Sequence, residues 1–369
     1  MGAGHFSAAR AVCAALRELE PGVRTSVVDS YEYAALVMSR VVSDGYIQMV
    51  KTIPQMYGYI YSRAERAKEA GPFRTWAHQF TASNLRALIA AERPDVVVCT
   101  HAFPCGAMSE YKKLFADAPP VVGIVTDFAV HGFWIHANVE GYCVATEASR
   151  DRLVAGGVRP ECVFVNGIPV DPGFSRPRES KRAIRERLGL PVDRPLALIM
   201  GGGLGIGPLE RILKELDAHE APIAAVVIAG RSEKAERRVL AAAESVRYPV
   251  RVLRFVDNVY EYMHAADAFV TKPGGLSSAE ALAAEVPMVL YKPLPGQEER
   301  NARVLTEWGA AARARTIAEL PAILMDVLTD SARRERMIEA ARRHGRPGAA
   351  RDAAQLILDL APSRKEVPA

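Results

Sequence analysis

Residues 271–301 of this 369-residue chain read TKPGGLSSAEALAAEVPMVLYKPLPGQEERN, and they decide the fold that we expect. A Gly-Gly turn at Gly274 and Gly275 precedes two hydroxyl side chains, Ser277 and Ser278, at which we predict that a helix begins. Glycines before a capped helix N-terminus present backbone N–H groups and the positive end of a helix dipole, which suit phosphate. The pattern predicts either a clamp for a nucleotide diphosphate or an ordinary strand-turn-helix of an α/β domain.

The rest of this stretch extends the same interpretation. Glu280 falls in the first turn of the predicted helix, where a carboxylate can accept two hydrogen bonds from a sugar diol. We expect the helix to run to Glu285 and to end at Pro287. A buried strand at 288–291 and a second turn at 293–297 should follow.

The composition indicates a soluble globular enzyme of about two domains. Hydrophobic residues make up 49% of the chain and charged residues 24%, and no run is apolar enough for a membrane span or a signal peptide. The net charge of +4 is too small to indicate a nucleic-acid partner. Cys13, Cys99, Cys105, Cys143 and Cys162 show no CxxC spacing, which favours reduced thiols in a cytosolic protein.

The first half of the chain has the pattern of a Rossmann-like domain. Residues 2–19, GAGHFSAARAVCAALREL, are typical of a glycine loop that enters an amphipathic helix. Such a loop normally follows a buried strand, so we expect the first N-terminal strand to be missing here. A short strand is predicted at 25–29, and a loop with Phe103, Pro104 and Gly106 after the strand at 94–99.

Polar and aromatic side chains gather after the buried strand at 121–126. Asp127, His131, Trp134 and His136 lie within ten residues of one another, just past the carboxyl end of that strand. In α/β sheets this is where sites form, so these residues are site candidates. The two histidines have no carboxylate at metal-ligand spacing, so no zinc site is expected.

Residues 31–68 are rich in tyrosine and methionine and poor in charge. They fit either a core segment, which the composition favours, or an amphipathic surface that lies on lipid headgroups.

The second half begins after a proline- and glycine-rich hinge, NGIPVDPGF at 166–174. A strand at 196–200 runs into GGGLGIGP at 201–208 and then a helix at 209–218, the setting of a phosphate loop. No Lys-Ser/Thr pair follows the glycines, which excludes a Walker loop, and the spacing disfavours a nicotinamide enzyme. After residue 301 we predict only helices, near 317–328, 331–344 and 348–360.

Two α/β halves that each open on a glycine loop are typical of nucleotide-sugar glycosyltransferases. We assign residues 1–166 to the first of two Rossmann-like domains and residues 167–347 to the second. Residues 348–369 should form a C-terminal helix and tail that pack back on the N-terminal domain.

A family resemblance covers nearly the whole chain. The stretch KPGGLSSAEALAAEVPMVLYKPLPGQEERNA resembles the donor-binding signature of the monogalactosyldiacylglycerol synthase and processive diacylglycerol beta-glucosyltransferase family, glycosyltransferase family 28. GAGHFSAARAV, PDVVVCTH, TDFAVHGFW and NGIPV resemble its other blocks, in order. The resemblance implies a GT-B fold, with two Rossmann-like domains facing each other across a cleft, and an inverting transfer from a UDP-sugar without a metal or cofactor. It also implies that residues 1–166 form the N-terminal acceptor and membrane-associating domain and residues 167–347 the UDP-sugar-binding domain.

The resemblance also implies roles for individual residues. The matching positions are His5 as general base; Gly202, Gly203, Gly274, Gly275, Ser277 and Ser278 around the diphosphate; Phe255 and Val256 at the uracil; Glu280 at the ribose; Gln297 and Glu298 near the donor sugar or ribose; and Asp127, His131 and Trp134 facing the acceptor. A histidine with a pKa near neutral suits removal of a proton from an acceptor hydroxyl, although a loop-capping histidine would read the same.

Three functions follow. The first is transfer of a hexose from UDP-glucose or UDP-galactose to diacylglycerol, by a cytoplasmic protein that lies on the anionic inner face of the cell membrane. The second is transfer to another lipid-linked acceptor, for example of the peptidoglycan-precursor type. The third is a catalytically silent UDP-sugar-binding protein.

Overall fold

The computed structural model describes residues 2–33, 72–176, 179–202 and 207–362. The chain forms two compact units. The first comprises residues 8–169 and the chain from Ala349 onward, and the second comprises residues 2–7 and 170–348.

The first unit is built on a four-stranded parallel sheet with the order β1-β2-β3-β4. Its strands are β1 (Val97–Cys99), β2 (Val121–Ile124), β3 (Gly141–Cys143) and β4 (Val163–Phe164). Its helices are α1 (Ala3–Leu19), of which residues 8–19 belong to this unit, α4 (Pro72–Glu92), α5 (Ala102–Leu114), α6 (Glu147–Ala155) and α15 (Ala349–Leu360).

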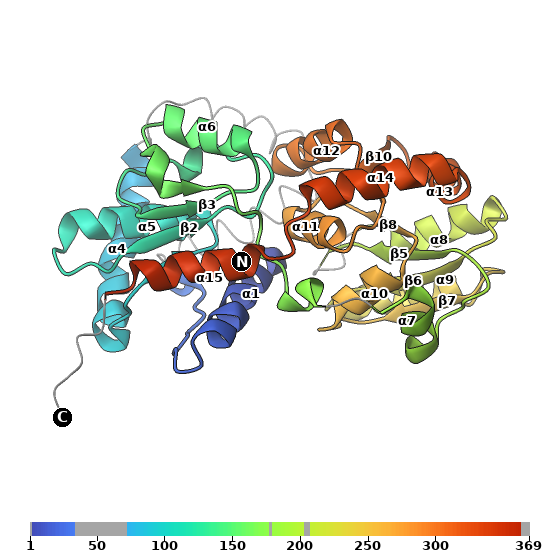
Figure 1. The fold of residues 1–369 in the computed structure, drawn as a ribbon, viewed down its shortest axis with the longest axis horizontal. Helices are drawn as coiled ribbons and strands as arrows, with labels where there is room; N and C mark the ends of the chain where they lie inside the picture. The colour runs from blue at the N-terminus through green and yellow to red at the C-terminus, as the bar shows by residue number, and fades with distance from the viewer. Residues whose placement is uncertain (1, 34–71, 177–178, 203–206, 363–369) are drawn as a thin grey trace. The chain divides into compact units, whose positions relative to one another are not determined.

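Alternation along β2 gives this sheet two buried faces. Val122 and Ile124 pack in one cluster with residues of α1 and α15, the N-terminal and C-terminal helices (Figure 1). Val121 packs in another cluster with residues of α4 and α5. The C-terminal helix is therefore part of the core of the first unit.

The second unit is built on a six-stranded parallel sheet with the order β10-β9-β8-β5-β6-β7. Its strands are β5 (Leu196–Met200), β6 (Ala224–Ile228), β7 (Val250–Leu253), β8 (Ala268–Thr271), β9 (Met288–Tyr291) and β10 (Ala311–Ala314). Its helices are α7 (Lys181–Leu188), α8 (Leu209–Ala218), α9 (Glu233–Ala243), α10 (Val259–Ala265), α11 (Gly275–Ala283), α12 (Gln297–Glu307), α13 (Leu320–Thr329) and α14 (Ser331–His344).

The chain order of this second sheet creates a switch point. From β5 the chain builds β6 and β7 on one side, and it then returns to build β8, β9 and β10 on the other. A crevice at the carboxyl ends of β5 and β8 is where sheets of this kind bind ligands.

Much of the predicted α/β order is confirmed. Six elements have the predicted bounds, namely 196–200, 209–218, 259–265, 268–271, 288–291 and 331–344. In the part of the chain that the structure describes, no helix is long and apolar enough to cross a membrane.

The predictions for the N-terminal region were wrong in two places. Residues 25–29 form no strand, because they pair with no strand among the described residues. The GAGH sequence is not a loop either, because helix α1 begins at Ala3 and includes Gly4 and His5.

Residues 102–114, where we predicted a loop, form helix α5 instead. His101 caps this helix, its Nδ1 accepting the N–H of Phe103 at 3.1 Å. Pro104 is tolerated in the first turn, where a backbone N–H is not needed. Gly106 is required because a Cβ there would lie 2.3 Å from the His78 ring. Glycine and proline thus serve packing here and do not break the helix.

The elements after residue 296 were only partly predicted. Helix α12 was not predicted, because the Pro- and Gly-rich turn before it favoured a turn up to Gln297. Strand β10 has the sequence Ala-Ala-Arg-Ala, which favours a helix, but it pairs along β9 from Ala311 to Ala314. Tertiary pairing overrides local propensity at this edge. The segment 31–68 lies almost entirely outside the described residues.

Candidate active site

The predicted donor residues follow the carboxyl ends of strands in the second sheet. Met200 on β5 is in register with Ile228 on β6 and with Thr271 on β8, and Ile228 is in register with Leu253 on β7. The loops after these four strands therefore emerge at one edge, on both sides of the switch point.

Helix α11 begins at Gly275, two residues earlier than the predicted start at Ser277. Gly274 is its N-cap, and no side chain caps the helix. The Ser277 hydroxyl donates to the Gly274 carbonyl at 3.4 Å, so it leaves the N–H groups of the first turn uncovered. The Ser278 hydroxyl is buried and has no hydrogen-bond partner among the described residues. The first turn can therefore receive an anion.

Glu280 is the sixth residue of α11, in the second turn and not the first as predicted, because Gly274 takes the capping position. Its side chain is 8% exposed. Burial, and to a smaller degree the nearby Asp171 carboxylate, raises the pKa of Glu280 to about 8. A buried carboxyl group of this kind binds well to hydroxyl groups that can replace the missing water.

An ion pair and a side-chain amide connect the turn before α11 with the turn that leads into α12. Lys272 Nζ lies 3.1 Å from Glu298 Oε1, and Glu298 Oε2 accepts the Leu294 N–H at 2.8 Å. Asn301 is fully buried, and its Nδ2 donates to the Pro273 carbonyl at 3.1 Å. The first turn of α12, which contains Gln297 and Glu298, is thereby fixed against the turn that precedes α11.

The glycine loop after β5 is described at its two ends. Gly202 has a φ of 77°, a conformation that favours glycine, and Gly203 lies outside the described residues. At the other end a Cβ on Gly207 would lie 2.8 Å from the Tyr291 hydroxyl. That hydroxyl is buried and has no partner in the described parts of the chain.

The residues predicted at the uracil follow β7. The Phe255 side chain is 37% exposed, and Val256 is half-buried. A nucleobase can therefore reach this segment.

The predicted acceptor residues form a well-anchored segment of the first unit. Asp127 lies three residues past β2, and His131 precedes a short 3₁₀ turn at Gly132–Trp134. The Thr146 and Ser149 hydroxyls both donate to the Phe128 carbonyl at 3.0 Å. These bonds hold the segment against the start of α6.

His131 and Trp134 are more buried than a loop at a strand end suggests. His131 is 5% exposed and Trp134 is 2% exposed, and their ring centroids lie 6.4 Å apart. Trp134 belongs to the core of the first unit, and its carbonyl accepts the Tyr142 hydroxyl at 2.7 Å. The contact of these residues with an acceptor stays a prediction.

His5 lies in the first turn of α1 and is half-buried, with its N–H bonded to the Gly2 carbonyl at 3.2 Å. Its place on a helix differs from the expected loop, and its role as a base stays a prediction.

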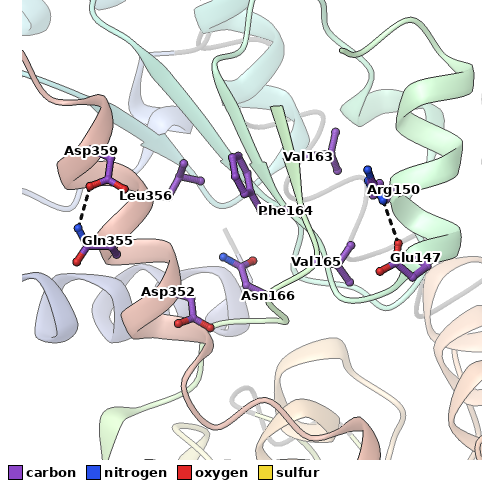
Figure 2. Close-up of a pocket in the computed structure, with 10 residues that line it drawn as sticks. All are labelled: Glu147, Arg150, Val163, Phe164, Val165, Asn166, Asp352, Gln355, Leu356 and Asp359. Carbon is purple, nitrogen blue, oxygen red and sulfur yellow. Dashed lines mark hydrogen bonds and ion pairs between the residues drawn. The ribbon is translucent and has the colours of Figure 1, made fainter. Parts of the chain in front are cut away.

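A surface cavity of about 530 Å³ lies elsewhere in the first unit, among residues of α6, β4 and α15 (Figure 2). Arg150 pairs with Glu147 at 3.5 Å, and Gln355 pairs with Asp359 at 2.8 Å. The predicted site residues do not line it.

Sequence reasoning passed over Lys272 and Asn301, although both lie in the stretch that was singled out. The position of Lys272 directly before a Pro-Gly-Gly turn could have identified it as a site residue. The role of Asn301 depends on the fold of α12, which was not predicted.

Two family models match successive parts of the chain. The model described as "Monogalactosyldiacylglycerol (MGDG) synthase" matches residues 5–170, and "Glycosyl transferases group 1" matches residues 180–344. The processive diacylglycerol beta-glucosyltransferase of Bacillus cereus (strain AH187) is 30% identical over 347 residues, which cover 94% of this chain and 88% of that protein. Its counterpart in Bacillus thuringiensis (strain Al Hakam) is 29% identical over 359 residues, 97% of this chain and 91% of that protein.

Solved structures show the same fold at low sequence identity. The S. aureus MnaA–UDP co-structure has a TM-score of 0.61 with 14% identity, over 98% of this chain and 96% of that one. MurG of Acinetobacter baumannii has a TM-score of 0.54 with 20% identity, over 79% and 80% of the two chains. These likenesses and the two parallel sheets identify the GT-B fold. With the identity to the Bacillus enzymes, they show that the chain belongs to the monogalactosyldiacylglycerol synthase and processive diacylglycerol beta-glucosyltransferase family, glycosyltransferase family 28.

Proposed function

We propose that this protein transfers a hexose, glucose or galactose, from a UDP-sugar to the hydroxyl of diacylglycerol at a membrane surface. One observation carries the donor half of this proposal. The N-terminus of α11, which no side chain caps, lies at the switch point of the second sheet, with Glu280 buried one turn later. Free N–H groups suit the diphosphate, and the carboxyl group suits the ribose diol.

In the proposed reaction the His5 imidazole accepts the proton of the diacylglycerol hydroxyl. The hydroxyl oxygen attacks the anomeric carbon of the donor from the face opposite UDP. The new C–O bond forms as the bond to the diphosphate oxygen breaks, so the configuration at that carbon inverts and UDP leaves.

The charge that develops on UDP needs stabilisation at that moment. We assign this to the N–H groups of the α11 first turn, which are oriented before the reaction begins, and to the backbone of Gly202. The proposal involves no metal or cofactor. Gln297 and Glu298 are proposed to lie near the donor sugar, and Asp127, His131 and Trp134 near the acceptor.

A panel of donors and acceptors tests this function. Purified protein is incubated with radiolabelled UDP-glucose or UDP-galactose and vesicles that contain either diacylglycerol or a lipid-linked peptidoglycan precursor. We expect a labelled glycolipid with diacylglycerol from one of the two donors. Label in the peptidoglycan precursor alone would support the other acceptor class, and UDP binding without any transfer would indicate a silent binding protein.

A further inference from the structure

An arginine and a phenylalanine stack at the carboxyl edge of the second sheet. The Arg231 guanidinium carbon lies 4.1 Å from the centroid of the Phe255 ring. Arg231 follows β6 and Phe255 follows β7, strands whose last residues, Ile228 and Leu253, are in register. The N–H of Ala229 bonds to the Leu253 carbonyl at 2.8 Å, which continues the pairing beyond the strands. The stack is therefore held by two paired strand ends.

The guanidinium of Arg231 differs from that of its neighbour Arg254. Arg254 pairs with Glu236 at 3.1 Å and with Glu233 at 3.6 Å. Among the residues that the structure describes, Arg231 pairs with no carboxylate, and its side chain is exposed. An aromatic ring thus supports the Arg231 guanidinium, and no carboxylate of the described residues neutralises its charge.

The stack lies beside the candidate donor site but apart from its phosphate cradle. In the strand order β8-β5-β6-β7, strand β6 is two places from β8, a separation of roughly 10 Å at the usual strand spacing. The cradle follows β8, at Gly274. A cation at the β6 end is therefore poorly placed for the diphosphate and is better placed for the far end of an extended nucleotide.

We propose that Arg231, supported by Phe255, stacks on the planar base of the uridine nucleotide. The inference rests on the proposed function and adds a base-binding residue to it. Arginine planes and aromatic rings are common stacking partners for nucleobases. Contact with the Phe255 ring restricts the guanidinium before the nucleotide binds, so less side-chain entropy is lost on binding.

Calorimetry with two ligands separates stacking from charge. UDP has an aromatic base, whereas 5,6-dihydro-UDP has the same phosphates and hydrogen-bonding edge on a puckered, non-aromatic ring. We expect Arg231→Ala to weaken UDP binding by roughly 5- to 100-fold, the range that base stacking contributes. Binding of dihydro-UDP should fall by less than threefold, a roughly estimated limit for loss of the charge alone. Arg231→Lys, which keeps the charge without the plane, should resemble Arg231→Ala.

Arg254→Ala is the matched control, because it removes a neighbouring arginine that is already paired, and it should leave both affinities unchanged. Equal losses for UDP and dihydro-UDP in Arg231→Ala would overturn stacking, as would an unchanged UDP affinity. Both of these outcomes leave the proposed function standing. If the wild-type protein binds no UDP, the proposed function fails together with this inference.

Discussion

Lys272 and Glu298 form an ion pair, with Nζ and Oε1 3.1 Å apart, in which both side chains are less than one-fifth exposed. The second oxygen of Glu298 accepts the Leu294 N–H at 2.8 Å. One carboxylate therefore joins the turn after β8 to the turn after β9. Since Lys272 immediately precedes the Pro-Gly-Gly turn, this pair sets the position of the α11 N-terminus.

The pair should contribute measurably to stability. Loss of one member leaves the other charged and largely buried, so Lys272→Met and Glu298→Gln should each lower the free energy of unfolding by about 1–3 kcal/mol. The double variant should lose less than the sum, as urea unfolding can measure. The exposed pair Arg182 and Glu186, at 2.9 Å, is the control and should show a coupling of about 0.5 kcal/mol or less. If the losses of the two single variants add up to the loss of the double variant, Lys272 and Glu298 do not stabilise the protein through their ion pair.

Glu280 should make the protein less stable as the pH rises. Its pKa is raised from 4.5 to about 8 in the folded protein. Between these pH values the folded chain keeps a proton that the unfolded chain releases, so this group lowers stability by up to about 1.4 kcal/mol per pH unit. Glu280→Gln removes the titrating group. The unfolding free energy of this variant, minus that of the wild type, should therefore increase from pH 5 to pH 8. A difference that does not change with pH would refute the raised pKa.

Tyr291→Phe should be neutral or stabilising. The hydroxyl that it removes is buried and has no partner in the described residues, so its loss breaks no hydrogen bond to those residues and removes a desolvated group. We expect a gain of up to about 1 kcal/mol in thermal or urea unfolding. The same change should partly rescue Gly207→Ala, since the new Cβ would lie 2.8 Å from that hydroxyl but 3.7 Å from the nearest ring carbons. A loss of stability in Tyr291→Phe would reveal a hydrogen bond to the hydroxyl.

His5→Ala should reduce turnover and leave donor binding intact. Removal of a general base typically costs about 100- to 10,000-fold in rate, whereas the UDP contacts assigned above do not include His5. Transfer rates and UDP affinity are measured on the same preparation. Arg10→Ala, an exposed substitution on the same helix, should leave both unchanged. Unaltered turnover in His5→Ala would remove this residue from the base role.

The sequence predicted the second unit well because its signals are local. Buried strands such as 196–200, which lies between Pro195 and Gly201, are short apolar runs bounded by proline or glycine, and their bounds need no tertiary information. The helix start at Gly275 was misplaced because serine is the common cap, and only the conformation of Gly274 shows that glycine takes this position.

Tertiary contacts explain the other errors. Gly106 and Pro104 read as loop residues, yet Gly106 packs against His78 from a distant helix. Strand β10 forms because β9 offers a partner. The ion pair between Lys272 and Glu298 joins residues 26 positions apart in the sequence, and no pattern of spacing predicts that they meet. Stacking of Arg231 on Phe255 depends in the same way on two strands meeting in register.

The anomeric configuration of the glycolipid product tests the central claim most directly. The protein is incubated with diacylglycerol and the α-linked donors UDP-glucose and UDP-galactose, and the coupling between the first two ring protons of the product sugar is measured by nuclear magnetic resonance. Inverting transfer predicts a hexosyl-diacylglycerol in the β configuration from at least one donor. An α-configured product would contradict the direct displacement that we propose, and the absence of any glycolipid with either donor would contradict the function itself.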